Sequence, residues 1–165
     1  MSPEPGEEID VAGLLDALRD AGQTVATAES VTGGGVCARL TDAAGASDVV
    51  RGGMVVYAWD LKTSLAGVSK ELIAERGTVD PDVTRLLADN ARARCGADWG
   101  LGLTGVAGPG PSGAIEAGTV YVAIAGPGVR EVEALRLLGD RGEVRAGAIA
   151  AALRLLWEHL RPVSR

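Results

Sequence analysis

Short apolar runs alternate with helix-like stretches along almost the whole chain, and this alternation restricts the fold more than any other feature of the sequence. The pattern predicts strands at residues 24–28, 51–58, 99–105, 118–126 and 129–138. It predicts helices from Val11 to a stop at Gly22, and over residues 34–41, 61–76, 81–96 and 142–160. Because strands and helices interleave, we expect a single three-layer α/β/α domain with a mixed, mostly parallel sheet.

The size and composition of the chain fit one domain with an aliphatic core. The chain has 165 residues, of which 47% are hydrophobic and none is phenylalanine. Ala, Val, Leu and Ile must therefore supply most of the buried surface. We predict a flexible N-terminal tail over residues 1–9 and a folded domain over residues 10–161.

The last strand, at residues 129–138, alternates apolar and polar residues, as is typical of a half-exposed strand near a sheet edge.

Charge and cysteine spacing argue against several classes of protein. A net charge of -6 disfavours broad nucleic-acid binding, although a small local basic site stays possible. The chain lacks an apolar run of about 18 residues, and its first residues are acidic where a signal peptide would be basic. We therefore expect a cytoplasmic protein without membrane association. Cys37 and Cys95 lack CxxC spacing, so neither a metal site nor a disulfide framework is predicted.

Two familiar catalytic or binding motifs lack the surrounding structure that they require. GLGLTG at residues 100–105 matches a dinucleotide-binding fingerprint, but it lies within a predicted strand and leads to Gly108-Pro109 instead of a helix. A Ser-His-Asp triad would have to use His159, the single histidine, which lies near the end of the last helix. We interpret this histidine as a solvent-facing residue at the helix end.

The stretch ATAESVTGGG at residues 26–35 places Glu29 and Ser30 between a predicted strand and a glycine-rich helix start. Such a turn presents backbone N–H groups and a helix N-terminus at the end of the strand. Serine in this position either caps the helix or acts as a nucleophile, and glutamate near the first turn favours the helix dipole. From this segment alone, capping is the more common role.

Further motifs follow this stretch in a fixed order and give the chain a family resemblance. They are TAES-x-TGG, LTDAAGAS, GGMVVYAWDLK, LTGVAGPG, GTVYVAIA and LGDRGEVR. Together they resemble the CinA C-terminal domain family, which includes the PncC-like nicotinamide mononucleotide deamidases. The resemblance extends from about Leu14 to Trp157, and it implies the same α/β/α fold that the strand and helix pattern predicts.

The resemblance implies an amidohydrolase that converts nicotinamide mononucleotide to nicotinic acid mononucleotide and ammonia, without a metal or organic cofactor. It implies that Ser30 is the nucleophile, that Tyr57 and Lys62 are its polar partners, and that Arg145 lies near the substrate. Family precedent also points to a homo-oligomer. We add as candidate substrate-binding residues those that the turn and the loops place nearby: Glu29, Thr32, Gly33, Gly34, Thr104, Gly105 and Arg141.

The residue types suit this chemistry. Serine must lose its proton as it attacks an amide, and without an available histidine the base must be another group, either Lys62 or Tyr57. Backbone N–H groups around residues 32–34 are candidates for stabilising the oxyanion. Arg141 and Arg145 are one helical turn apart, so both can face one phosphate. Each residue also has a simpler interpretation: Lys62 and Tyr57 as ordinary surface or packing residues, and Arg141 as an ion-pair partner of a neighbouring acid.

The sequence also departs from the family pattern. Val31 stands where the family usually has cysteine, Trp59 where it has asparagine, and Asp80 where it has serine; Glu116-Ala117 replaces a Lys-Pro pair. Asp80 is a good helix cap, so the fold need not change. These departures bear on the substrate more than on the fold. The alternative function is therefore a noncatalytic, competence- or damage-inducible CinA-like protein that binds a nucleotide or a protein partner.

Overall fold

The computed structural model describes residues 8–160, and within them the chain forms a five-stranded mixed sheet. The strand order is β2-β1-β3-β4-β5, with bounds β1 Val25–Glu29, β2 Val50–Val55, β3 Trp99–Gly105, β4 Thr119–Gly126 and β5 Val129–Arg136. β1 pairs in parallel with β2 and β3, whereas β4 is antiparallel to both β3 and β5. Four of the five strands therefore point the same way, which confirms the predicted mixed, mostly parallel sheet.

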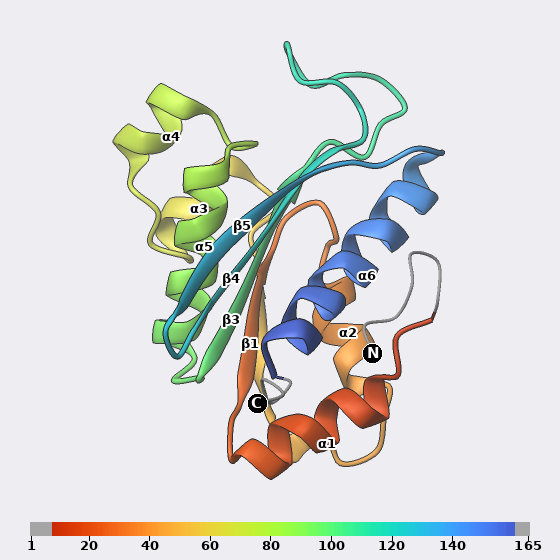
Figure 1. The fold of residues 1–165 in the computed structure, drawn as a ribbon. Helices are drawn as coiled ribbons and strands as arrows, with labels where there is room; N and C mark the ends of the chain where they lie inside the picture. Colours follow the sequence, from red (N-terminus) through yellow and green to blue (C-terminus); the bar gives the residue numbers. More distant parts are fainter. Residues whose placement is uncertain (1–7, 161–165) are drawn as a thin grey trace.

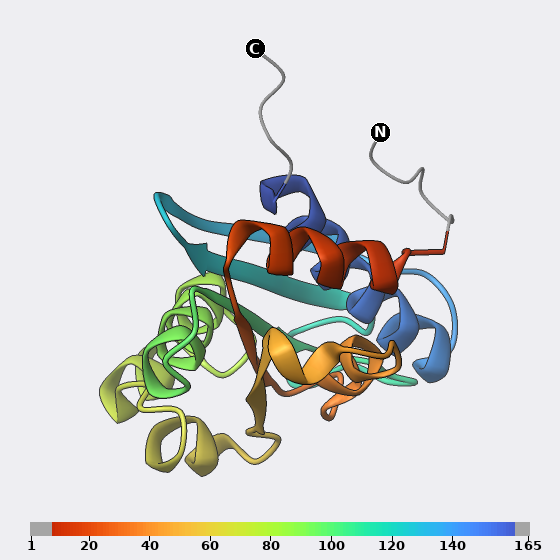
Figure 2. The same cartoon turned by 90° about the horizontal axis from the view of Figure 1, so that it is seen from below.

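Helices cover both faces of the sheet, so the predicted three-layer fold is confirmed. α1, α2 and α6 lie on one side, and α3, α4 and α5 lie on the other (Figures 1 and 2). Their bounds are α1 Val11–Ala21, α2 Gly35–Thr41, α3 Trp59–Ser64, α4 Lys70–Arg76, α5 Pro81–Arg94 and α6 Arg141–Leu160; a short 3-10 helix, η1, spans Ala46–Asp48.

Aliphatic side chains fill the core on both faces, as the composition predicts. The larger cluster lies against α1, α2 and α6, and the smaller one lies against α4 and α5. Trp99 is the exception, because its indole ring is buried in the larger cluster while its N–H donates to Gln23 Oε1 at 2.8 Å. β5 has the mixed exposure expected of an edge strand.

The structure corrects one predicted helix. The helical tract expected over residues 61–76 is two helices, because the chain turns at Gly67 (φ +71°) and Ser69 caps α4 by accepting from Leu72 N–H. Ile9, which lies within the predicted tail over residues 1–9, is buried against the core. Most of that tail, and the predicted end of the domain at residue 161, lie outside the described residues.

A close helix crossing explains two of the three glycines of GLGLTG, Gly100 and Gly102. A Cβ on Gly100 would lie 2.1 Å from the carbonyl oxygen of Ala88, and one on Gly102 would lie 2.6 Å from that of Thr84. Both neighbours belong to α5, so the absence of side chains at these positions lets α5 approach β3 at backbone distance. Gly100 and Gly102 therefore serve helix packing, whereas Gly105 lies against β4, where a Cβ would be 2.8 Å from the Thr119 carbonyl oxygen.

Candidate active site

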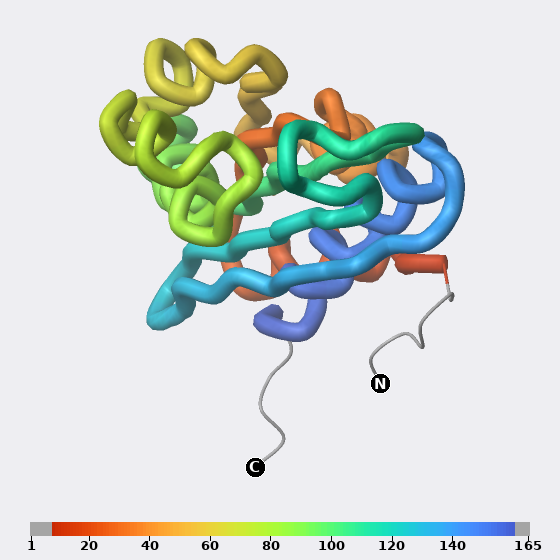
Figure 3. The backbone as a smooth tube through the Cα atoms, turned by 90° about the horizontal axis from the view of Figure 1, so that it is seen from above, coloured from red at the N-terminus to blue at the C-terminus, as the bar shows by residue number. Residues whose placement is uncertain are grey.

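Three parallel strands bring the predicted site residues to one edge of the sheet. Ser30 follows β1, Tyr57 follows β2, and Thr104 lies near the end of β3. Because β1, β2 and β3 are parallel neighbours, their carboxyl ends meet at the same edge. Figure 3, viewed from above, shows the turn after β1, the segment after β2 and the loop between β3 and β4 gathered at this edge.

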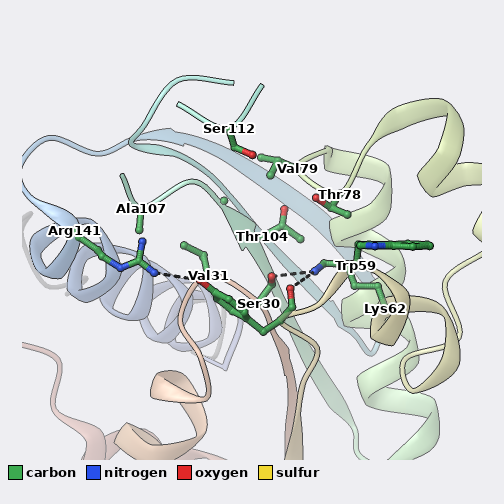
Figure 4. Close-up of a pocket in the computed structure, with 12 residues that line it drawn as sticks. Ser30, Val31, Trp59, Lys62, Thr78, Val79, Thr104, Ala107, Ser112 and Arg141 are labelled. Atoms are coloured by element: carbon green, nitrogen blue, oxygen red, sulfur yellow. Dashed lines mark hydrogen bonds between the residues drawn. The ribbon is translucent and has the colours of Figure 1, made fainter. Parts of the chain in front are cut away.

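Ser30 and Lys62 are in direct contact. The Lys62 ammonium nitrogen Nζ lies 3.0 Å from Ser30 Oγ, although the residues are 32 positions apart in sequence. Ser30 is 9% exposed and fixed by its backbone, which donates to the Leu103 carbonyl and accepts from Gly33 N–H. Lys62, on α3, is only 2% exposed. The fold therefore places a lysine where it can exchange a proton with a serine that lines a pocket (Figure 4).

Burial changes the acid-base behaviour of Lys62. Desolvation of the amine lowers the pKa of Lys62 from 10.5 to about 8, because an apolar environment disfavours the charged form. Nζ also lies 2.8 Å from the Val56 carbonyl oxygen and 3.3 Å from that of Tyr57. A neutral amine has two N–H bonds and one lone pair. With the N–H bonds directed to the two carbonyls, the lone pair is left to accept the Ser30 proton.

Glu29 lies beneath the site and not in it, which corrects the prediction that it contacts substrate. It is fully buried, and each carboxylate oxygen accepts two hydrogen bonds. Oε1 accepts from Thr32 Oγ1 and Val36 N–H, and Oε2 accepts from Thr27 Oγ1 and Cys37 N–H. The carboxylate thus satisfies the first N–H groups of α2 and anchors the turn that holds the serine.

The other predicted turn residues also lie outside the pocket lining. Thr32 is fully buried, so neither its N–H nor its hydroxyl, which donates to Glu29, faces solvent. Gly33 and Gly34 adopt φ of +60° and +94°, conformations that side chains rarely permit. They shape the tight turn into α2. None of the predicted oxyanion donors at residues 32–34 lines the pocket.

The two arginines take different positions, although they are one turn apart on α6. Arg145 donates to the carbonyl oxygens of Val31 at 3.3 Å and Thr32 at 3.1 Å, so it supports the backbone beside Ser30. Arg141 lines the pocket, donating to the Gly108 carbonyl at 2.8 Å and to the Tyr57 hydroxyl at 3.1 Å. The expectation that both face one ligand is therefore not met in this structure.

Two adjoining cavities form the site. The first, of about 150 Å³, contains Ser30, Lys62 and Trp59, and the second, of about 240 Å³, extends over the loop between β3 and β4. They share the lining residues Tyr57, Gly105, Ala107, Ser112 and Arg141. The side chains that line them include the cations Lys62 and Arg141 and, among the described residues, no acid. An acidic protein therefore has a locally basic pocket, which suits an elongated anionic ligand.

The aromatic residues at the pocket are largely open to solvent. Tyr57 is 60% exposed and Trp59 is 58% exposed. Trp59 and Arg141 lie on opposite sides of Ser30 in Figure 4. The Tyr57 hydroxyl contacts Arg141, and only its backbone carbonyl contacts Lys62. Of the two candidate bases, the structure brings Lys62 and not the Tyr57 hydroxyl to the serine.

Thr104 and Gly105 line the first cavity, as predicted, together with residues that the sequence did not indicate. These are Val31, Thr78, Val79, Ala107 and Ser112. Thr78 and Val79 precede α5, which Asp80 caps by accepting from the N–H groups of Asp82 and Val83. Capping by Asp80 was predicted, and it identifies the start of α5. The sequence does not indicate that the residues before this helix start line the pocket.

His159 is less exposed than expected. Its ring stacks on Trp99 with centroids 6.2 Å apart, and Nε2 lies 3.1 Å from Glu131. It lies at the far end of α6 from Arg141, which lines the pocket. Within residues 8–160, no three His, Cys, Asp or Glu side chains are grouped as metal ligands. None of the helices in this range combines the length and apolarity needed to cross a bilayer.

Comparison with known proteins gives a consistent result. The family model described as the CinA C-terminal domain matches residues 10–160. A CinA-like protein of Myxococcus xanthus is 40% identical over 156 residues, covering 93% of this chain and 37% of the relative. Another, from Frankia casuarinae, is 42% identical over 143 residues, covering 87% of this chain and 33% of the relative. The chain thus spans about a third of the length of the curated relatives it matches.

Solved structures agree with this assignment. The competence/damage inducible protein CihA from Agrobacterium tumefaciens superposes with a TM-score of 0.87 at 31% identity, covering 92% of this chain and 93% of that chain. The competence damage-inducible protein A from Klebsiella pneumoniae gives a TM-score of 0.88 at 30% identity, with coverage of 93% and 96%. The match therefore includes the whole α/β/α domain.

Proposed function

Because the chain belongs to the CinA C-terminal domain family, we propose that it hydrolyses the carboxamide of nicotinamide mononucleotide, giving nicotinic acid mononucleotide and ammonia. One observation carries the proposal: a buried lysine with a lowered pKa lies 3.0 Å from the hydroxyl of a serine that lines a pocket. Such a pair provides both the nucleophile and the base that amide hydrolysis requires.

In the first half of the proposed reaction, Ser30 Oγ attacks the carboxamide carbon and its proton passes to neutral Lys62. The carbonyl π electrons move onto oxygen, forming a tetrahedral oxyanion. Lys62 then returns the proton to the carboxamide nitrogen, the C–N bond breaks with its electron pair going to nitrogen, and ammonia leaves. The product of this half-reaction is an ester of Ser30.

The second half repeats the proton transfers with water as the nucleophile. Lys62 takes a proton from a water molecule as it attacks the ester carbon, and then returns a proton to Ser30 as the C–O bond breaks. Nicotinic acid mononucleotide is released, and the free serine is restored. Val31 lines the first cavity and directly follows the nucleophile, so we assign its N–H as the oxyanion donor.

The two cavities suit the two ends of the proposed substrate. The carboxamide lies beside Ser30 in the first cavity, and the phosphate lies toward Arg141 and the glycine-rich loop in the second. A guanidinium can donate two parallel hydrogen bonds to a phosphate, which a lysine ammonium cannot match in geometry. Arg145 supports this arrangement indirectly, by holding the carbonyl oxygens of Val31 and Thr32.

The proposal is tested by following both products with nicotinamide mononucleotide and with its dephosphorylated riboside. We expect nicotinic acid mononucleotide and ammonia in equal amounts from the nucleotide, and a higher KM for the riboside. Arg141→Met is expected to raise KM for the nucleotide by about tenfold, the value of one charge-assisted contact, and to leave KM for the riboside nearly unchanged. If neither compound releases ammonia, the proposed activity is excluded.

A second candidate is a noncatalytic protein that binds a partner at the same edge. Exposed apolar or aromatic residues run from the end of β2 through α3, and two of them, Tyr57 and Trp59, line the pocket; the others are Val55, Leu61 and Leu65. Contiguous exposed apolar surface commonly marks an interface, either with another protein or with a second copy of the chain. This candidate predicts no ammonia release, together with a change in association state when Leu61 and Leu65 are replaced by polar residues.

A further inference from the structure

A chain of hydroxyl groups connects the first cavity to the start of α5. Thr104, on β3, lines the cavity, and its Oγ1 lies 2.8 Å from Oγ1 of Thr84 on α5. Thr84 Oγ1 in turn lies 2.7 Å from the backbone carbonyl oxygen of Asp80. Both threonine side chains are buried, Thr84 fully and Thr104 to 1% exposure. Gly102 makes the contact possible, because it lets α5 approach β3 at this point.

The direction of these hydrogen bonds follows from counting protons. A carbonyl oxygen can only accept, so the single hydroxyl proton of Thr84 is donated to Asp80. In the contact between the two threonines, Thr84 must then accept and Thr104 must donate. The hydroxyl proton of Thr104 is therefore directed away from the cavity. What Thr104 offers to a ligand is a lone pair.

We infer that Thr84 is a positioning residue that makes Thr104 an obligatory acceptor, so that the site prefers a carboxamide to the corresponding carboxylate. This inference rests on the proposed function, since it concerns the same pocket. A carboxamide nitrogen has two N–H bonds and can donate one to Thr104. A carboxylate has only acceptor oxygens, so it faces the Thr104 lone pair without a hydrogen bond. The arrangement favours binding of the amide substrate over the acid product, which differ only in this group.

The test measures binding in the absence of turnover. In the Ser30→Ala protein, dissociation constants for nicotinamide mononucleotide and nicotinic acid mononucleotide are determined by titration calorimetry. With Thr84 present, the amide is expected to bind more tightly. Thr84→Val removes the acceptor of the Thr104 proton, which becomes free to donate to the acid. The ratio of acid to amide dissociation constants is expected to fall at least about fivefold, because a neutral hydrogen bond is worth that much and a bond to a carboxylate is stronger.

Three further variants separate positioning from general damage. Thr84→Ser keeps the hydroxyl and is expected to restore the ratio. Thr27→Val applies the same change to a buried threonine that donates to Glu29 outside the pocket, and is expected to leave the ratio unchanged. Thr104→Val removes the acceptor itself and should lower the ratio even if Thr84→Val fails to fold. Thermal melts establish which variants are folded.

The outcomes distinguish this inference from the function on which it rests. If the Ser30→Ala protein binds both nucleotides but folded Thr84→Val and Thr104→Val leave the ratio unchanged, Thr84 does not set the preference and the inference is wrong. If the Ser30→Ala protein binds neither nucleotide, the proposed substrate is wrong, and the inference falls with it.

Discussion

At the scale of single residues, the contact between Lys62 and Ser30 determines what the site can do. Lys62 is held by two backbone carbonyls, and its third contact is the serine hydroxyl. The burial that leaves Lys62 only 2% exposed is also what lowers its pKa. A lysine in this environment is matched to work as a base near neutral pH.

The pH dependence of the proposed reaction follows from the pKa of Lys62. The base form is the neutral amine, which is the major form above a pKa of about 8. We therefore expect kcat/KM to rise about tenfold per pH unit below this value and to level off above it. Initial rates between about pH 6 and about pH 9.5, with circular dichroism to verify folding at each pH, provide the measurement. A flat profile over this interval would contradict a lysine base.

Trp59 gives a second test at this scale. Its exposed ring lines the cavity where the family pattern has asparagine, and an indole face attracts a cationic pyridinium ring. Trp59→Asn is expected to raise KM for nicotinamide mononucleotide by about threefold, as for an exposed cation–π contact. KM for the reduced nucleotide, whose ring is uncharged, should change less.

Leu61→Asn is the matched control for Trp59, because Leu61 is also exposed on α3 but does not line the cavity. It should leave both KM values unchanged. Equal effects of Trp59→Asn on the oxidised and reduced nucleotides would show that the ring contributes bulk and not charge recognition.

The sequence was sufficient to predict some of these residues and insufficient for others. Ser30, Lys62, Thr104 and Arg141 line the pocket as expected. Glu29 was placed wrongly, because its position in sequence next to the serine does not reveal that its side chain turns inward. The role of Thr84 could not be predicted, because the sequence of a helix does not indicate which strand residue a threonine on it will contact.

At the scale of elements, a buried carboxylate controls the start of α2. Glu29 accepts four hydrogen bonds, two of them from N–H groups of this helix. Glu29→Gln replaces one acceptor oxygen by an NH₂ group that faces donors. We expect unfolding by urea to show a loss of about 3 kcal/mol, because buried donors lose their acceptor.

Asp60→Asn is the matched control, because Asp60 is an exposed acid in the first turn of α3. Its loss should cost less than about 1 kcal/mol. Similar losses in the two variants would mean that Glu29 acts only through the helix dipole, and that its buried hydrogen bonds contribute little.

The crossing of α5 over β3 is the second feature at this scale. Gly102→Ala would bring a Cβ to 2.6 Å from the Thr84 carbonyl oxygen, which is backbone and cannot move without shifting the helix. We expect a loss of about 3 kcal/mol in the free energy of unfolding, together with weaker substrate binding as Thr84 moves from Thr104. Gly110→Ala, where a Cβ has no neighbour within 4 Å, should be nearly neutral. Equal stability of the two variants would show that the crossing is not tight.

At the scale of the whole molecule, the parallel part of the sheet builds the pocket. β2, β1 and β3 bring together segments that are distant in sequence, and α3, the segment before α5 and the first residue of α6 add further lining residues. The alternation of strands and helices was sufficient to predict the fold class and the layers. It was insufficient for the strand order and for the break between α3 and α4, because both depend on tertiary packing that periodicity does not encode.

The most direct measurement is ammonia release from nicotinamide mononucleotide by the purified protein, beside a folded Ser30→Ala control and without added metal. The account predicts release by the wild-type protein and none by the variant, since the nucleophile alone is removed. Release at wild-type rate from Ser30→Ala would contradict the assignment of Ser30. Absence of release from a folded wild-type protein would contradict the proposed activity itself.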